Sequence, residues 1–91
     1  MKLLMYTEEH VDIFLNIDNI CSFRIYKSDS NWVISADLND DNSYIIYKSD
    51  SNNMCHYILN SLVGTIEVSS TLIFSMHLIV SRSINEMYNE E

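Results

Sequence analysis

Apolar and polar residues alternate along four segments in the first half of the chain. A period of two is typical of a β-strand that buries one face, and short polar turns separate the successive segments. The pattern therefore predicts an antiparallel β-meander, with a tight turn at Asp18-Asn19 between the first two strands. The four segments are Val11–Ile17, Ile20–Lys27, Trp32–Leu38 and Ser43–Lys48.

The apolar spacing changes after residue 53 and becomes helical. The recurring residues are Met54, Cys55, Ile58, Leu59 and Leu62, which lie on one side of an α-helix. Asp50 or Ser51 can cap the N-terminus of this helix, and Gly64 stands just past its predicted end. Residues 65–68 then fit a short strand.

Residues 71–88 fit two patterns. The helical stripe consists of Leu72, Ile73, Met76, Ile79, Val80, Ile84 and Met87, and the alternating strand pattern of Leu72, Phe74, Met76, Leu78 and Val80. We favour the helix because its stripe continues where the strand pattern stops, and the strand remains the alternative. The whole chain, residues 1–91, is predicted to be one α+β domain, an antiparallel β-meander of three to five strands packed with one or two helices.

One heptapeptide, Ile-Tyr-Lys-Ser-Asp-Ser-Asn, occurs at Ile25–Asn31 and again at Ile46–Asn52. The first copy precedes a predicted strand and the second a predicted helix. Its Ser and Asp side chains can serve either a hairpin turn or a helix cap. The register predicts that Tyr26 and Tyr47 share one strand face, opposite Ile25 and Ile46.

The charge balance restricts the class of partner. Thirteen acidic and five basic residues give a net charge of −8. Such a chain repels nucleic-acid phosphates and anionic membrane surfaces, whereas a basic protein surface attracts it. Acidity that only maintains solubility is the alternative explanation.

Targeting segments and cysteine motifs are missing from the sequence. The longest apolar stretch, Leu72–Val80, is shorter than the about 20 residues of a membrane span, and the apolar run Leu3–Tyr6 is too short for a signal peptide. Cys21 and Cys55 form neither a metal motif nor a disulfide framework. We therefore expect a soluble cytoplasmic protein.

The residue patterns that could indicate a metal site or a catalytic site are weak throughout the sequence. Residues 37–42 have oxygen ligands at calcium-loop positions, but Asn42 replaces the turn glycine and Lys48 replaces the bidentate glutamate. The cysteines and histidines do not have zinc-ligand spacing. Cys55 and His56 point about 100° apart on a helix, so they cannot form a catalytic pair. We expect no metal, no cofactor and no enzymatic activity.

In size, acidity and lack of catalytic motifs, the chain is similar to the small inhibitors carried by phages and mobile elements, anti-CRISPR proteins among them. The resemblance implies a non-catalytic protein that binds a bacterial defence protein in the host cytoplasm. Carboxylates on turns can imitate phosphates and occupy a basic nucleic-acid-binding surface. The residues expected to contact such a partner are Asp37, Asp40, Asp41, Glu8, Glu9, Asp12, Tyr26 and Tyr47.

A second hypothesis is a self-associating structural or scaffold protein. The segment from Leu72 to Val80 is apolar on nearly every side, more than one small domain readily buries. A homodimer could cover it across a two-fold axis. The residues expected in that interface are Leu72, Phe74, Met76 and Ile79.

Overall fold

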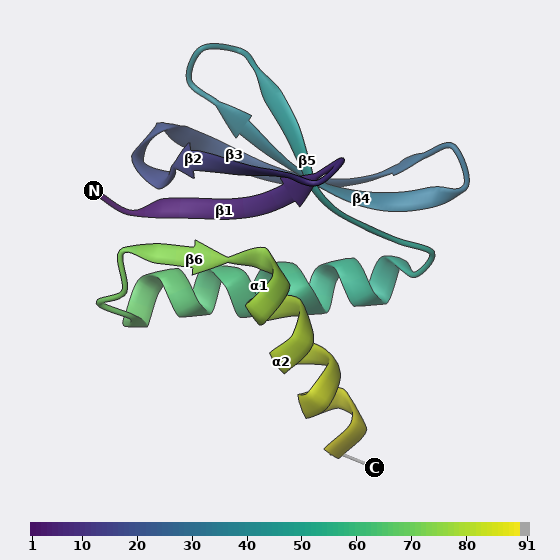
Figure 1. The fold of residues 1–91 in the computed structure, drawn as a ribbon. Helices are drawn as coiled ribbons and strands as arrows, with labels where there is room; N and C mark the ends of the chain where they lie inside the picture. Colours follow the sequence, from purple (N-terminus) through teal and green to yellow (C-terminus); the bar gives the residue numbers. More distant parts are fainter. Residues whose placement is uncertain (90–91) are drawn as a thin grey trace.

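The computed structural model describes residues 1–89, and it has two three-stranded sheets and two helices (Figure 1). This confirms the predicted α+β class. The strands are β1 (Leu3–Glu8), β2 (Val11–Asn16), β3 (Ile20–Ser28), β4 (Asn31–Leu38), β5 (Ser43–Ser49) and β6 (Ile73–Ser75). The helices are α1 (Asn52–Val68) and α2 (Met76–Asn89), with a 3-10 helix at Ile17–Asn19.

The predicted meander is present as the antiparallel sheet β3-β4-β5. Ile34 of β4 lies between Ile25 and Tyr47 of its neighbours, and Ala36 lies between Phe23 and Tyr44. Since paired residues point to the same side, these apolar residues form one continuous inner face. Helix α1 lies below this sheet in Figure 1, and its buried residues join the same core.

The two heptapeptide copies end as predicted. In the first copy, Asp29 and Ser30 form a two-residue hairpin loop in which Asp29 has a φ of 56°. In the second copy, the Ser51 side chain accepts a hydrogen bond of 3.2 Å from the Met54 amide and caps α1. The same short polar side chains therefore satisfy a turn in one place and a helix terminus in the other.

The second sheet, β2-β1-β6, was only partly predicted. Strand β1 pairs antiparallel with β2 and parallel with β6, so it is central. Its Leu4 and Tyr6 are buried, and the intervening Leu3 and Met5 are half-buried. Apolar residues on both faces remove the alternation that reveals a strand in the sequence.

The predicted pairing of Val11–Ile17 with Ile20–Lys27 is wrong. Asp18 and Asn19 belong to the 3-10 helix, and the Asn16 side chain accepts a hydrogen bond from the Asp18 amide at its start. Because this turn redirects the chain, β2 and β3 enter different sheets. At this turn the Asn39 amide donates to the Asn19 carbonyl at 2.9 Å, which extends the pairing of β3 with β4 beyond Ile20 and Leu38.

Helix α1 does not end at Gly64, and residues 65–68 are helical instead of extended. Gly64 is exposed, has no positive φ, and has nothing within 4 Å of the position of an added Cβ. A glycine inside a helix costs about 1 kcal/mol relative to alanine, which packing of the flanking turns can offset. Ile66 packs against the core beyond the glycine, and the Lys2 ammonium donates to the Ile66 and Ser69 carbonyls.

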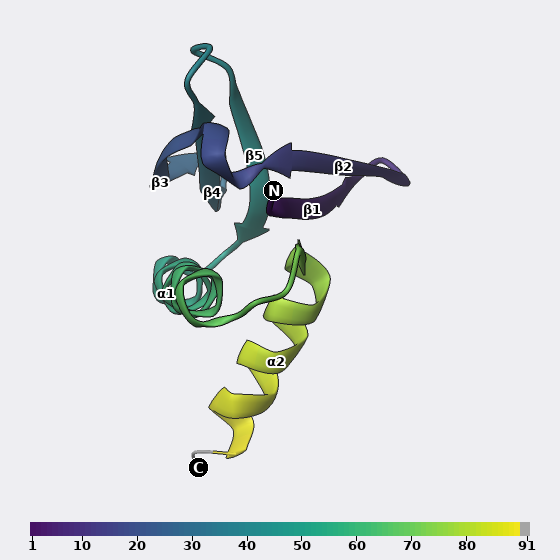
Figure 2. The same ribbon diagram turned by 90° about the vertical axis from the view of Figure 1, so that its left-hand side faces the viewer.

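The segment 71–88, for which the sequence left helix and strand open, contains a short strand followed by a helix. Ile73–Ser75 pairs with β1, and the Leu3 amide donates to the Leu72 carbonyl at 2.8 Å. The helix α2 begins only at Met76, where Ser75 Oγ accepts a hydrogen bond of 3.4 Å from the Leu78 amide. In Figures 1 and 2 α2 extends away from both sheets, while its Glu86 carboxylate accepts a hydrogen bond of 3.2 Å from the Tyr57 hydroxyl of α1.

Candidate partner-binding surface

The turn between β1 and β2 presents Glu8, Glu9 and Asp12, all exposed. Glu9 and His10 have φ angles of 50° and 68°, the left-handed pair of a two-residue hairpin loop. Residues other than glycine and asparagine pay a steric cost in this conformation. The Thr7 hydroxyl donates to the Asp12 carboxylate at 2.8 Å across the two strands, and this bond orients the carboxylate.

The turn between β4 and β5 presents Asp40 and Asp41, also exposed. Asp41 has a φ of 69°, and the Asp40 carboxylate accepts the Asn42 amide at 3.1 Å. The Asn39–Asn19 hydrogen bond brings the exposed Asp18 to the same end of the molecule. The structure therefore gathers three carboxylates here, of which the sequence analysis named two.

These two acidic turns do not form one patch. Figure 2 shows the β1–β2 hairpin pointing to one side, while the β4–β5 turn stands at the top of the molecule. A partner would have to contact two separate acidic groups, or only one of them.

Asp37, the third acid predicted in this region, is already bonded within the chain. Its carboxylate, 15% exposed, accepts hydrogen bonds from Arg24 Nε at 2.6 Å and Nη2 at 3.1 Å. Three hydroxyls complete the network, those of Ser22, Ser35 and Ser43 at 2.7–3.1 Å. Arg24, followed by the serine hydroxyls, holds the pKa of the Asp37 carboxyl well below its usual range. Its charge is thus largely neutralised by Arg24 before any partner arrives.

Tyr26 and Tyr47 do not share a face, and that prediction is wrong. Tyr26 pairs with Val33, whereas Tyr47 pairs with Ile34, which points to the opposite side of β4. The cause is a β-bulge in β5 opposite Ile34 and Ser35, where Ile46 is the extra residue. Tyr47 consequently packs against the core, and Tyr26 lies on the outer face with its ring 5.2 Å from the Arg24 guanidinium.

The predicted self-association residues are mostly internal. Phe74, Met76 and Ile79 are buried in the core of the chain itself, at 3–4% exposure. Leu72 alone of the four is exposed, at 63%. Its exposed apolar neighbours Ile73 and Leu78 were not predicted as interface residues, because the pattern over 71–88 left their side-chain directions open.

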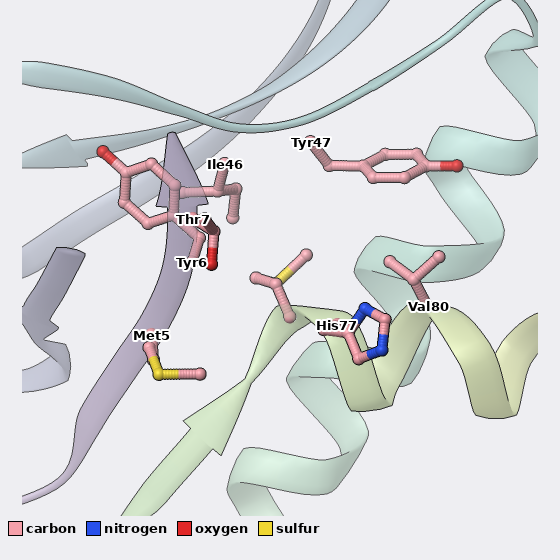
Figure 3. Close-up of a pocket in the computed structure, with 8 residues that line it drawn as sticks. Met5, Tyr6, Thr7, Ile46, Tyr47, His77 and Val80 are labelled. Atoms are coloured by element: carbon pink, nitrogen blue, oxygen red, sulfur yellow. The ribbon is translucent and has the colours of Figure 1, made fainter. Parts of the chain in front are cut away.

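A half-open cavity of about 440 Å³ lies between the end of β1, β5 and the start of α2 (Figure 3). Its wall is mainly apolar, with Met5, Ile46 and Val80, and carries polar groups from Thr7 and His77. Burial raises the pKa of the Tyr47 phenol at its edge, and the charge of Asp50 adds to this effect. The arrangement can hold an apolar side chain.

Tyr6 also lines this cavity, and its hydroxyl is the buried side-chain polar atom without a hydrogen-bond partner in residues 1–89. Burial raises its pKa, followed by the charges of Glu8 and Tyr44. In Figure 3 the hydroxyl points away from His77 and Val80. It therefore offers no polar contact to a group bound against α2.

The nucleophilic and metal-ligating side chains are dispersed. Cys55 is buried, which raises the pKa of its thiol, and Cys21 is exposed with its thiol 3.3 Å from the Asp37 carbonyl. Within residues 1–89, no three His, Cys, Asp or Glu side chains are grouped so that they could hold a metal ion. No helix in that range has the length and apolarity to cross a membrane.

The strongest property of the surface is its unneutralised charge. Within residues 1–89 the structure contains one ion pair, between Arg24 and Asp37. Ten carboxylates are exposed outside it, those of Glu8, Glu9, Asp12, Asp18, Asp29, Asp40, Asp41, Asp50, Glu67 and Glu86. Comparison of the chain with protein-family models, curated proteins and solved structures finds no match.

Proposed function

We propose that the protein is a non-catalytic interaction protein that docks with its carboxylates on a basic, nucleic-acid-binding surface of a larger protein. The proposed class is that of small phage inhibitors of the anti-CRISPR kind, with a bacterial defence protein as the target. The observation that carries the proposal is the set of ten exposed carboxylates that have no cationic partner in residues 1–89. Such a surface attracts a partner with the opposite charge.

The basic side chains support this interpretation because three of the five are bonded within the fold, Arg82 among them through its hydrogen bond of 2.7 Å to Thr65 Oγ1. Arg24 neutralises Asp37, and the Lys2 ammonium is bonded to the carbonyl groups at the end of α1. They satisfy acceptors inside the fold and do not pair with the acidic turns, and Lys48 lines one cavity with Glu8 and Glu9. Negative charge at both turns is therefore available to a partner.

The test measures binding to a panel of CRISPR effectors, Cas9 among them, over a salt series. We expect at least one effector to bind, with an affinity that falls about tenfold or more between 50 and 300 mM NaCl as charges are screened. DNA should compete for the same surface. Affinity that is indifferent to salt, or no binding to any effector, would contradict the proposal.

Charge-neutralising variants assign the contact to one turn or the other. Glu8→Gln with Glu9→Gln alters the β1–β2 turn, and Asp40→Asn with Asp41→Asn alters the β4–β5 turn. Asp29→Asn, in the β3–β4 loop, removes one exposed charge outside both turns and is the control. We expect one double variant to weaken binding at low salt by about tenfold, and the control to change it less than twofold.

Self-association is the second candidate, and the exposed apolar residues at the start of α2 favour it. Leu72, Ile73 and Leu78 are 63%, 50% and 67% exposed. Light scattering at increasing protein concentration tests the dimer, with Leu72→Ser as the disrupting variant. A strict monomer at the highest concentration removes this candidate.

A further inference from the structure

One side of α2 carries an apolar stripe that the rest of the fold covers only in part. Met76, Val80, Ile84 and Met87 are spaced by three or four residues, so they lie along one side of the helix. Val80 and Ile84 are half-buried, and Met87 is 36% exposed. The Ile79 and Ser83 side, in contrast, is fully packed, with exposures of 4% and 0%.

Two cavities lie along this stripe. The one of about 440 Å³ contains Met76 and Val80, and a second of about 280 Å³ is lined by Met54, Ile84, Met87 and Tyr88. Val80 and Ile84 are one helical turn apart on the same side, so the cavities follow each other along α2. The two cavities share no lining residue, and this side of α2 with its two cavities is called the groove below.

The groove is rich in methionine. Of the five methionines in the chain, Met5, Met54, Met76 and Met87 line these two cavities, and Met1 does not. Methionine side chains are flexible and polarisable, so they adapt to apolar surfaces of varied shape. A surface of this kind suits the apolar face of a helix lying in a groove.

The charges beside the groove are mainly acidic. The negative charge of Asp50 contributes to the raised pKa of Tyr47, which lines the first cavity. An adjoining cavity, which shares Thr7 and Tyr47 with the first, carries Glu8 and Glu9. Lys48 is the basic residue there. The balance of three acids to one base attracts a cationic partner.

We infer that this groove binds an amphipathic α-helix of the partner, with its apolar side on the methionines and its lysine or arginine side toward the acids. The inference rests on the proposed function and specifies the recognised element. Helix α2 has 14 residues and is ~21 Å long, so a partner helix of similar length can follow it. In the partner helix, the apolar anchor residues recur at positions i, i+4, i+7 and i+11.

The first experiment uses synthetic peptides and the methionine methyl groups as reporters. The probe is an 18-residue peptide with leucine at the anchor positions and lysine elsewhere. Two controls keep its length: one replaces lysine by glutamate, and one scrambles the leucines. In spectra of protein labelled at the methionine methyl carbons, the probe should shift Met5, Met54 and Met87 and leave Met1, 80% exposed and outside the cavities, unchanged.

Fluorescence anisotropy then separates the groove from general charge attraction. We expect the probe to bind at least tenfold more tightly than either control peptide. Met87→Ser with Tyr88→Ser should weaken it by about tenfold, since both side chains are exposed and their loss leaves the core intact. Leu78→Ser, on the opposite side of α2 and 67% exposed, is the matched control and should change the affinity less than twofold.

The outcomes distinguish the inference from the proposed function. Equal binding of the scrambled peptide, unshifted methionine signals, or a dimer that occupies the groove would overturn the helix-binding inference alone. Salt-independent binding of the effector panel would overturn the electrostatic proposal alone. Loss of probe affinity in the Met87 and Tyr88 variant, with the Leu78 variant unchanged, supports the groove in either case.

Discussion

At the scale of single residues, Asp37 has the most connected side chain that the structure describes. Arg24 is 56% exposed, so the ion pair by itself contributes little free energy in water. The serine hydroxyls contribute more, because they surround a carboxylate that is 15% exposed and joins all three strands of the outer sheet face. The network therefore stabilises the meander more than it contributes a charge for recognition.

Asp37→Asn should lower the free energy of unfolding at pH 7 by about 1 to 2 kcal/mol, because charge-assisted hydrogen bonds are replaced by weaker ones. The native pKa of Asp37 lies below that of the unfolded chain. Its stabilisation is thus complete above about pH 4 and is lost as the pH falls below the unfolded value. Urea denaturation should show that the difference in the free energy of unfolding between wild type and Asp37→Asn decreases from pH 5 to pH 2.

Asp40→Asn is the control for this measurement, since Asp40 is exposed and its bond to the Asn42 amide can be made by an asparagine oxygen. We expect it to change stability by less than about 0.5 kcal/mol. A constant gap between wild type and the Asp37 variant over the pH range would show that the carboxylate charge is irrelevant to folding.

At the scale of elements, the sequence predicts strands that bury one face and a helix terminus that has a capping residue. Alternation revealed β2 to β5, and the serine before residue 52 revealed the start of α1. Strand β1 was hidden because both its faces are covered, and the end of α1 because core packing beyond Gly64 outweighs one glycine. The bulge at Ile46 left no signal in the sequence, so the positions of Tyr26 and Tyr47 could not be separated.

The residues of the candidate site also divide into those that the sequence predicts and those that it does not. The acids of the turns were predictable because turns and exposure coincide. The methionine groove was not predictable, because its residues come from β1, α1 and α2, and only their packing brings them together. The helical spacing of Met76, Val80, Ile84 and Met87 was the available signal, but it does not show which side of α2 remains uncovered.

The repeated heptapeptide provides a matched pair of substitutions. Ser51→Ala removes the N-cap of α1 and should destabilise the protein by about 1 kcal/mol. Ser30→Ala changes the same position of the first copy, in an exposed hairpin loop, and should cost less than about 0.5 kcal/mol. Thermal denaturation of both variants checks this, and equal destabilisation would argue against the cap as the source of the difference.

At the scale of the whole molecule, the ten exposed carboxylates that lack an ion-pair partner within residues 1–89 repel one another. Mutual repulsion favours expansion of the chain, and salt screens it. We expect an increase from about 20 to 300 mM NaCl to stabilise the fold by about 1 kcal/mol, which raises the Tm by about 4 to 8 °C for a domain of this size.

Glu8→Gln with Glu9→Gln should reduce this salt effect, since it removes two neighbouring charges from one turn. A Tm that falls on adding salt would mean that the Arg24–Asp37 attraction outweighs the repulsion among the remaining acids. The measurement thus reports whether the surface charge is carried at a cost in stability, as a charge retained for binding would be.

The identical heptapeptides also have a consequence for inheritance. A deletion that fuses the two copies would remove 21 residues, since the copies begin at Ile25 and Ile46, and would leave one heptapeptide. The shortened chain would lose Trp32–Leu38 of the central strand β4 and Ser43–Ile45 of β5, so the one remaining heptapeptide strand would have no partner in this sheet. A lineage that keeps both copies intact therefore preserves β4.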